Sequence, residues 1–237
     1  LRRSLKQYAY ILDSVQIGLD LNSDFTIECD FITMDNTVTQ DFVMKWGGQN
    51  QRSWNFSYPL CLGMQVSSDG TFNNSTGAYV SWTPSNGVLY HLATVFDMTT
   101  GSAKFFVNGI QFGNTQYNLK TSIYNSSEPV CIGIYNIAEG GFQTENLDGF
   151  IGNVRVWNDK RTDVEILENC EKFILGNEEN LVSYWELNGD FLDKSPNQNN
   201  LTPVNSPSFV DFDFENQSYR KVVLNTNKEI GSSIFTD

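Results

Sequence analysis

Histidine is almost missing from this sequence, which has one, His91, in 237 residues. Nucleophilic catalysis by a Ser-His-Asp or Cys-His set needs an imidazole base, and many zinc sites need imidazole ligands. The four cysteines show no C-x-x-C pair or other spacing typical of a metal or redox motif. These absences nearly exclude His-based catalysis and a Cys/His metal centre.

The cysteines instead stand among ordinary core residues. Cys29 shares a predicted strand face with apolar neighbours, and Cys170 follows Ile166 by one helical repeat, so both are predicted to be small buried apolar groups. Cys61 and Cys131 could meet across neighbouring strands. Free thiols are the favoured state, and a disulfide joining these two is the alternative.

Basic residues and long apolar runs are scarce too. Fifteen Lys and Arg stand against 28 Asp and Glu, for a formal net charge of -13. This field repels phosphate backbones, so nucleic acid is not an expected partner; for most carboxylates the favoured explanation is a soluble surface. No run approaches the roughly 20 apolar residues of a membrane span, so no membrane insertion is expected. No signal peptide opens the chain, but it begins at Leu1 rather than Met, which makes this weak evidence about export.

The sequence does contain strand patterns. Aromatic residues make up 14 % of it, and turn residues recur along its length. Asn108-Gly109 supplies the positive φ angles of a two-residue hairpin turn. Period-two alternation in residues 23–31 places four apolar side chains on one face: Phe25, Ile27, Cys29 and Phe31.

A turn, a strand and a short helix follow one another from residue 147. Residues 147–158 spell Leu-Asp-Gly-Phe-Ile-Gly-Asn-Val-Arg-Val-Trp-Asn, and Thr162 and Glu165 then have the spacing of a capping box. This combination resembles the strand-and-helix signature of laminin G-like and pentraxin-like modules. Further strands of that family are resembled by residues 23–31, 90–97, 104–112 and 181–187.

The resemblance runs from about Tyr8 to about Phe209 and implies an all-β fold. That fold is an antiparallel two-sheet jelly-roll β-sandwich of the concanavalin A type, with one short helix near Thr162. A chain of this length commonly forms one such domain. The side chains predicted to lie buried between the sheets are Phe25, Ile27, Phe31, Leu92, Phe96, Val154 and Val156.

We predict that residues 1–210 form the sandwich and that residues 211–237 form a C-terminal appendage packing on the sandwich or on a partner. Residues 181–209 could close the same sandwich or open a further repeat. Closure is favoured because a half-module would expose Trp185 and Leu187. The other expected elements are an edge strand near residues 8–11, a strand at 42–46, a polar insert at 49–58 and a strand at 60–66.

Some enzymes share this jelly roll, notably laminarinase-like glycoside hydrolases with a Glu-x-Asp-x-x-Glu strand motif. Its outer carboxylates act as nucleophile and acid, about 5 Å apart. Here Glu28 and Asp30 match the first two positions, but Thr33 stands at the last. We therefore expect no enzyme, and a glycoside hydrolase is the third hypothesis. The resemblance gives His91 a structural role.

Calcium is a candidate cofactor through the same resemblance. In pentraxins, a loop before the corresponding strand holds calcium with Glu, Gln and Asp side chains, and calcium prefers six to eight oxygen ligands. The contiguous acidic cluster of pentraxins is absent here, where Tyr135 and Ile137 stand, so a bound calcium ion is not the favoured state. The oxygen donors that the loop offers are Asn136, Glu139, Glu145 and Asp148.

Glycan binding needs an exposed aromatic surface bordered by amides and carboxylates. Trp157 and Trp185 match core motifs of the family and are predicted to be structural. Partial burial over the ends of the sandwich is an equally weighted alternative for the candidate ligand-binding residues, which fall in or beside predicted loops: Trp46, Trp54, Tyr58 and Trp82.

The leading hypothesis is a non-catalytic recognition module on a cell or particle surface, binding carbohydrate or a surface protein. Its expected location is extracellular, on a cell surface or on a virion surface. The runner-up is a structural subunit of an extracellular or virion assembly, in which residues 211–237 bind neighbouring subunits or copies of the chain. Missing catalytic chemistry, a long extra C-terminal segment and weakened calcium ligands all fit this second hypothesis.

Overall fold

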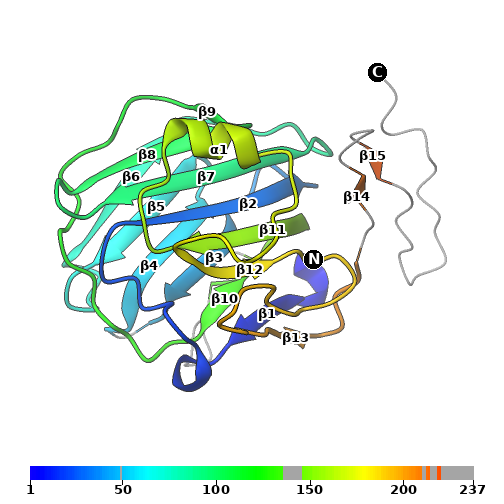
Figure 1. Ribbon diagram of the computed structural model, residues 1–237, viewed down its shortest axis with the longest axis horizontal. Coiled ribbons are helices and arrows are strands. Elements are labelled where there is room, and N and C mark those ends of the chain that lie inside the picture. Colours follow the sequence, from blue (N-terminus) through cyan, green and yellow to red (C-terminus); the bar gives the residue numbers. More distant parts are fainter. Residues whose placement is uncertain (49, 136–145, 210–211, 214–217, 220–237) are drawn as a thin grey trace.

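Two antiparallel sheets pack face to face in the computed structural model (Figure 1), which describes residues 1–48, 50–135, 146–209, 212–213 and 218–219. The seven-stranded sheet has the order β13 (Thr202–Val204), β1 (Tyr8–Ile11), β10 (Val130–Ile132), β3 (Gln40–Trp46), β4 (Arg52–Tyr58), β5 (Leu62–Ser67), β6 (Ser75–Val80). The six-stranded sheet has the order β12 (Leu181–Trp185), β11 (Gly149–Trp157), β2 (Phe25–Thr33), β7 (Tyr90–Asp97), β8 (Ser102–Val107), β9 (Ile110–Gln111).

Short helices and a small separate sheet complete the described structure. The α-helix is α1 (Asp163–Asn169), and two 3-10 helices, η1 (Arg3–Leu5) and η2 (Asp13–Val15), flank β1. Strands β14 (Phe212–Asp213) and β15 (Ser218–Tyr219) pair only with each other. Within the part of the chain that the structure describes, no helix has the length and apolar character of a transmembrane span.

The core between the sheets confirms the predicted jelly roll. All seven predicted core side chains belong to one buried cluster, and none is more than 1 % exposed. Phe25 and Phe96, which are partners in the β2–β7 register, also touch through their rings with centroids 5.1 Å apart. Alternation along β2 therefore sends one set of side chains inward, as the sequence predicts.

Helix α1 begins where the capping box predicts. The Thr162 hydroxyl accepts a hydrogen bond from the Glu165 backbone N–H at 3.2 Å, and a Glu165 carboxylate oxygen accepts one from the Thr162 N–H at 2.7 Å. The helix lies across the outer face of the six-stranded sheet (Figure 1), where Ile166 packs on Ala93 and Phe106.

Residues 181–204 close the same sandwich, as predicted. Strand β12 pairs with β11, and β13 pairs with β1. Trp185 is fully buried and its indole N–H donates to the Asn199 carbonyl at 2.7 Å. The Asn108-Gly109 turn between β8 and β9 is confirmed too, with φ angles of 51° and 77°.

Two local expectations were wrong, and one alternative is excluded. The insert at residues 49–58 was expected to be a polar loop, but it contains strand β4, in which buried Trp54 and Phe56 alternate with polar residues. Strand β1 is not an edge strand, because β13 pairs outside it. Cys61 and Cys131 do not meet, since β3 and β4 separate β10 from the strand that follows Cys61, and all four thiols are free as favoured.

The division at residue 210 stays a prediction. Most of residues 211–237 lie outside the described residues, and only the backbone of β14 and β15 is described.

Candidate functional site

The outer face of the seven-stranded sheet is built from rows of paired residues. Partners in the strand register share a face, and the inner row, which includes Val43, Phe56 and Met64, belongs to the core. The neighbouring outer row runs across six strands through Tyr10, Cys131, Met44, Asn55, Gln65 and Gly77. A second outer row runs through Asp41, Ser57, Gly63 and Tyr79.

One half of this face is apolar. Buried Met44, Trp46 and Cys131 form a small cluster with Ile134, separate from the core. Half-buried tyrosines pack against it, and the rings of Tyr8 and Tyr10 have centroids 6.2 Å apart. Burial raises the pKa of the Cys131 thiol, so this cysteine behaves as an apolar side chain.

The other half presents amides. The Asn55 side-chain amide donates to the Gln65 side-chain oxygen at 3.0 Å. Asn55 is 4 % exposed, and its own amide oxygen has no hydrogen-bond partner among the described residues. A buried acceptor without a donor costs roughly 1–3 kcal/mol.

Tyr79 lies flat on the same face. A Cβ atom on Gly63 or on Gly77 would come within 2.5 Å of the Tyr79 ring, so both positions need glycine for the ring to cross the sheet there. The side chain is 41 % exposed. Burial raises the pKa of Tyr79, so its phenol is neutral at physiological pH. The face therefore combines an open aromatic ring, an amide pair and a buried acceptor.

The four aromatic residues predicted as ligand contacts do not form an exposed surface. Trp46, Trp54, Tyr58 and Trp82 are 3 %, 0 %, 1 % and 8 % exposed. The Trp54 indole N–H donates to the Leu19 carbonyl at 3.1 Å inside the sandwich. Tyr58 and Trp82 pack edge to face with centroids 6.0 Å apart.

The physical reason is their place in the sheets. Three of the four side chains belong to strands β3 and β4 rather than to loops, and of these only Trp46 lies in the outer-face cluster. Trp54, Tyr58 and Trp82 belong to the buried core, where Tyr58 and Trp82 touch each other. The four side chains are therefore buried, but mostly within strands rather than over the ends of the sandwich.

Of the predicted calcium donors, Asn136, Glu139 and Glu145 lie outside the described residues. Asp148 stands just before β11, where its backbone N–H donates to the Gln40 side chain at 3.1 Å. Within the described ranges, no group of three or more His, Cys, Asp and Glu side chains could hold a metal ion. Asp148 cannot make a calcium site without the undescribed donors, so calcium binding stays a prediction.

Glu28, at the first position of the glycosidase motif, is buried beneath α1 and the segment that follows it. Glu28 is 1 % exposed; one oxygen accepts from the Trp157 indole N–H at 2.6 Å and the other lies 3.1 Å from the His91 ring nitrogen Nε2. Burial alone would raise the pKa of Glu28, but the His91 hydrogen bond and the Arg155 charge outweigh it and hold the pKa below its ordinary value. No substrate can reach this carboxylate.

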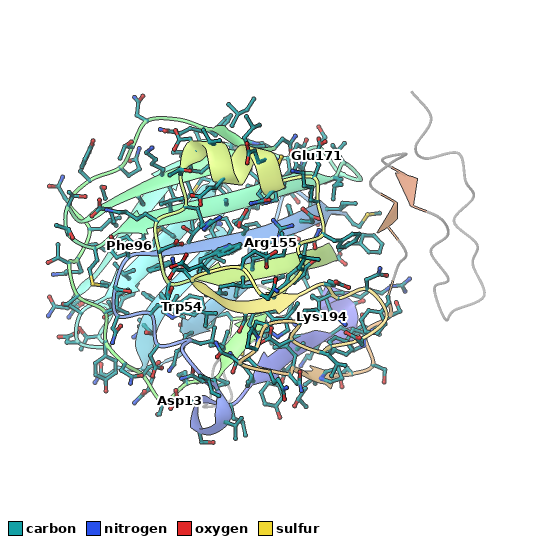
Figure 2. The ribbon with its side chains drawn as sticks, viewed as in Figure 1. Asp13, Trp54, Phe96, Arg155, Glu171 and Lys194 are labelled. Carbon is teal, nitrogen blue, oxygen red and sulfur yellow. The ribbon has the colours of Figure 1, made fainter. Side chains whose placement is uncertain are left out.

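Arg155 holds the end of α1 and the residues that follow it over Glu28, His91 and Trp157. Its guanidinium donates to the carbonyls of Asn169, at 2.9 Å, and of Lys172, and so ties the end of α1 to the six-stranded sheet. Figure 2 shows Arg155 on the face of this sheet. Sequence reasoning identified His91 as structural but missed Arg155, whose only signal is a single charge inside the apolar stretch Val154–Val156.

The sheets, their order and the helix define a jelly-roll sandwich of the lectin and glucanase type. Residues 6–167 match the family model Laminin_G_3, described as the concanavalin A-like lectin/glucanases superfamily, and the chain belongs to this superfamily. No curated protein sequence matches the chain significantly.

Solved structures share the fold. A putative carbohydrate binding protein from Bacteroides ovatus ATCC 8483 has a TM-score of 0.59 at 17 % identity over 83 % of this chain, which spans 57 % of that protein. The heptameric SAP-like pentraxin from Limulus polyphemus has a TM-score of 0.57 at 15 % identity, covering 83 % of this chain and 88 % of the pentraxin. The Ruminococcus gnavus IT-sialidase CBM40 has a TM-score of 0.52 at 17 % identity, with coverages of 68 % and 92 %.

Proposed function

We propose that this chain is a non-catalytic carbohydrate-binding module and that it binds glycan on the outer face of the seven-stranded sheet. The observation that carries the proposal is the open ring of Tyr79 on the same sheet face as the amide pair of Asn55 and Gln65. Membership of a superfamily named for lectins supports it. So does similarity in fold to two solved structures, a putative carbohydrate binding protein and a CBM40 module.

The chemistry of the face suits a sugar. A pyranose has an apolar C–H face that packs on an aromatic ring and hydroxyls that need fixed hydrogen-bond partners. Tyr79 supplies the ring, and Gln65 supplies a half-exposed amide. A neutral set of this kind selects a polyol rather than an ion.

The buried carboxylates support the non-catalytic part of the proposal. Retaining glycoside hydrolysis needs two carboxylates about 5 Å apart that reach the sugar, whereas both oxygens of Glu28 face Trp157, His91 and Arg155 beneath α1. We place the module on a cell or particle surface, where a glycan-binding module meets its ligand. The structural-subunit alternative depends on residues 211–237 and is tested with them below.

A glycan array with and without calcium tests the function, followed by calorimetry with the best ligand. Tyr79→Ala should weaken binding about 10-fold, as loss of one stacking contact of about 1.4 kcal/mol predicts. Gln65→Ala should weaken it similarly. The matched control is Tyr117→Ala, which removes a 65 % exposed tyrosine elsewhere and should change nothing.

Unchanged affinity in both face variants would place the site elsewhere. The absence of any glycan ligand under either condition would reject carbohydrate binding.

A further inference from the structure

A cavity of about 90 Å³ lies where the end of β2 meets the first half of β11. Residues 186–188, Phe191 and residues 207–209 complete its wall, close to where the chain leaves the sandwich toward β14 (Figure 1). None of the residues that carry the proposed glycan face, Asn55, Gln65 and Tyr79, lines it. The cavity is therefore a separate candidate site.

Five phenylalanines stand in the largely apolar wall. The rings of Phe191 and Phe209 touch, with centroids 4.7 Å apart. Phe31 is fully buried, whereas Phe173 is 43 % exposed at the mouth of the cavity. The five lining phenylalanines come from separate segments of the chain: Phe31, Phe150, Phe173, Phe191 and Phe209.

Two carboxylates stand in this aromatic wall. Asp30 is 8 % exposed, and its Oδ2 accepts from the Asn153 amide at 2.8 Å. No Lys or Arg side chain lines the described wall, which also contains the half-buried Glu186. The amino group of Leu1, which also lines the cavity, donates to the Gly149 carbonyl at 2.7 Å, and burial lowers its pKa to about 6, so it is mostly neutral at pH 7. The wall therefore carries net negative charge, in a chain whose net charge is -13.

We propose that this cavity binds a small organic cation, an ammonium group on a short apolar stem. Aromatic faces attract cations through their quadrupoles, and a nearly buried carboxylate forms a charge-assisted hydrogen bond with an ammonium donor. Asp30 and Glu186 bind the ammonium group, and the phenylalanines surround the stem.

The size of the cavity separates this ligand from a sugar. An apolar cavity of about 150 Å³ accommodates benzene, so about 90 Å³ suits a stem of about four heavy atoms. A pyranose ring with its hydroxyls needs more volume than this. The cation site is thus an addition to the glycan face, and either proposal can fail without the other.

Butylammonium is the probe, with butanol as the neutral match and butyrate as the anionic match. Calorimetry or NMR titration should show saturable binding of butylammonium, butanol at least about 10-fold weaker, and no binding of butyrate. The 10-fold difference is what loss of a hydrogen bond to a charged group predicts. Tyr79→Ala should leave butylammonium binding unchanged.

Three charge-neutralising variants locate the site. Asp30→Asn should weaken butylammonium binding about 10-fold or more, and Glu186→Gln should also weaken it. Glu168→Gln removes an exposed carboxylate of α1 and should leave it unchanged. A melting curve checks that Asp30→Asn folds; if it does not, Glu186→Gln alone decides.

Absent butylammonium binding, equal affinity for butanol, or unchanged affinity in the folded wall variants would overturn the proposal. The capped lysine Nα-acetyl-lysine amide distinguishes the source of the cation. Tighter binding of butylammonium indicates a free amine, and equal binding indicates the lysine side chain of a protein.

Discussion

At the scale of single residues, Glu28 shows how a catalytic-looking position becomes a structural one. Its carboxylate joins Trp157, His91 and Arg155, which come from two other strands of the same sheet. Alternation in the sequence predicts that Glu28 and Asp30 share a face. It cannot predict that α1 covers that face, because the cover comes from residues more than a hundred positions away.

Replacing Glu28 should destabilise the fold. Glu28→Gln removes the charge that compensates buried Arg155, and breaking a buried ion pair costs roughly 3 kcal/mol. Urea denaturation at pH 7 measures the loss in the free energy of unfolding. Glu168→Gln on the exposed face of α1 should change it by less than about 0.5 kcal/mol; an equally small effect of Glu28→Gln would show that the cluster does not stabilise the sandwich.

As the pH rises, ionisation of Asp30 should lower the stability of the fold, whereas ionisation of Glu28 should raise it. Burial raises the pKa of Asp30 to about 6, although the charges of His91 and Arg155 and the Asn153 hydrogen bond lower it, while Glu28 adds to the rise. The folded state then binds a proton more tightly than the unfolded state, so this residue makes the protein less stable as the pH rises from about 4 to about 6.

Asp30→Asn tests this linkage. The difference in the free energy of unfolding between Asp30→Asn and the parent should change in favour of the variant by about 3 kcal/mol from pH 4 to pH 7.5. The reason is that the pKa of Asp30 is raised by about two units, and one pKa unit corresponds to about 1.4 kcal/mol. Urea denaturation of both proteins across this range checks it, and the difference between them cancels the titration of other groups. A constant difference would mean that Asp30 titrates with an ordinary pKa.

At the scale of elements, the sequence predicts strands better than it predicts which residues meet. β2 and the helix start at Thr162 follow from alternation and from a capping box. β4 was missed because Ser53, Asn55 and Ser57 alternate with its aromatic residues and make the segment look polar.

The candidate face was missed for a related reason. Asn55, Gln65 and Tyr79 lie on three different strands, and only the register of β4, β5 and β6 brings them onto one face. Register depends on long-range packing, which a single sequence does not display. The tryptophans were predicted to contact the ligand because a large aromatic side chain suits a sugar, but the same size and apolar character favour burial in the core.

Calcium binding can be tested in the segment from Asn136 to Asp148. If these residues bind calcium, the ion should raise the melting temperature as its concentration rises, because it binds the folded state. Glu139→Ala combined with Glu145→Ala should abolish the shift. No calcium-dependent shift in the parent protein, or one that survives the double substitution, would remove the site.

At the scale of the whole molecule, the role of residues 211–237 separates a binding module from a structural subunit. The sandwich reaches its last sheet strand at β13, and Phe209 still packs on Phe191. Beyond it, residues 219–224 alternate apolar and polar side chains, and Ile234-Phe235 adds an apolar end that a solvated tail does not need.

Truncation after Val210 distinguishes the two roles. If the segment packs on its own sandwich, the truncated protein should melt at a lower temperature with no change in assembly. If it joins neighbouring subunits, the melting temperature should stay unchanged while oligomers are lost. We expect the first outcome, because a stretch as long as residues 219–224 can pair with an open sheet edge, and unpaired edges invite aggregation. Thermal melts with size-exclusion chromatography decide between them, and an unchanged melting temperature with lost oligomers would favour the structural subunit.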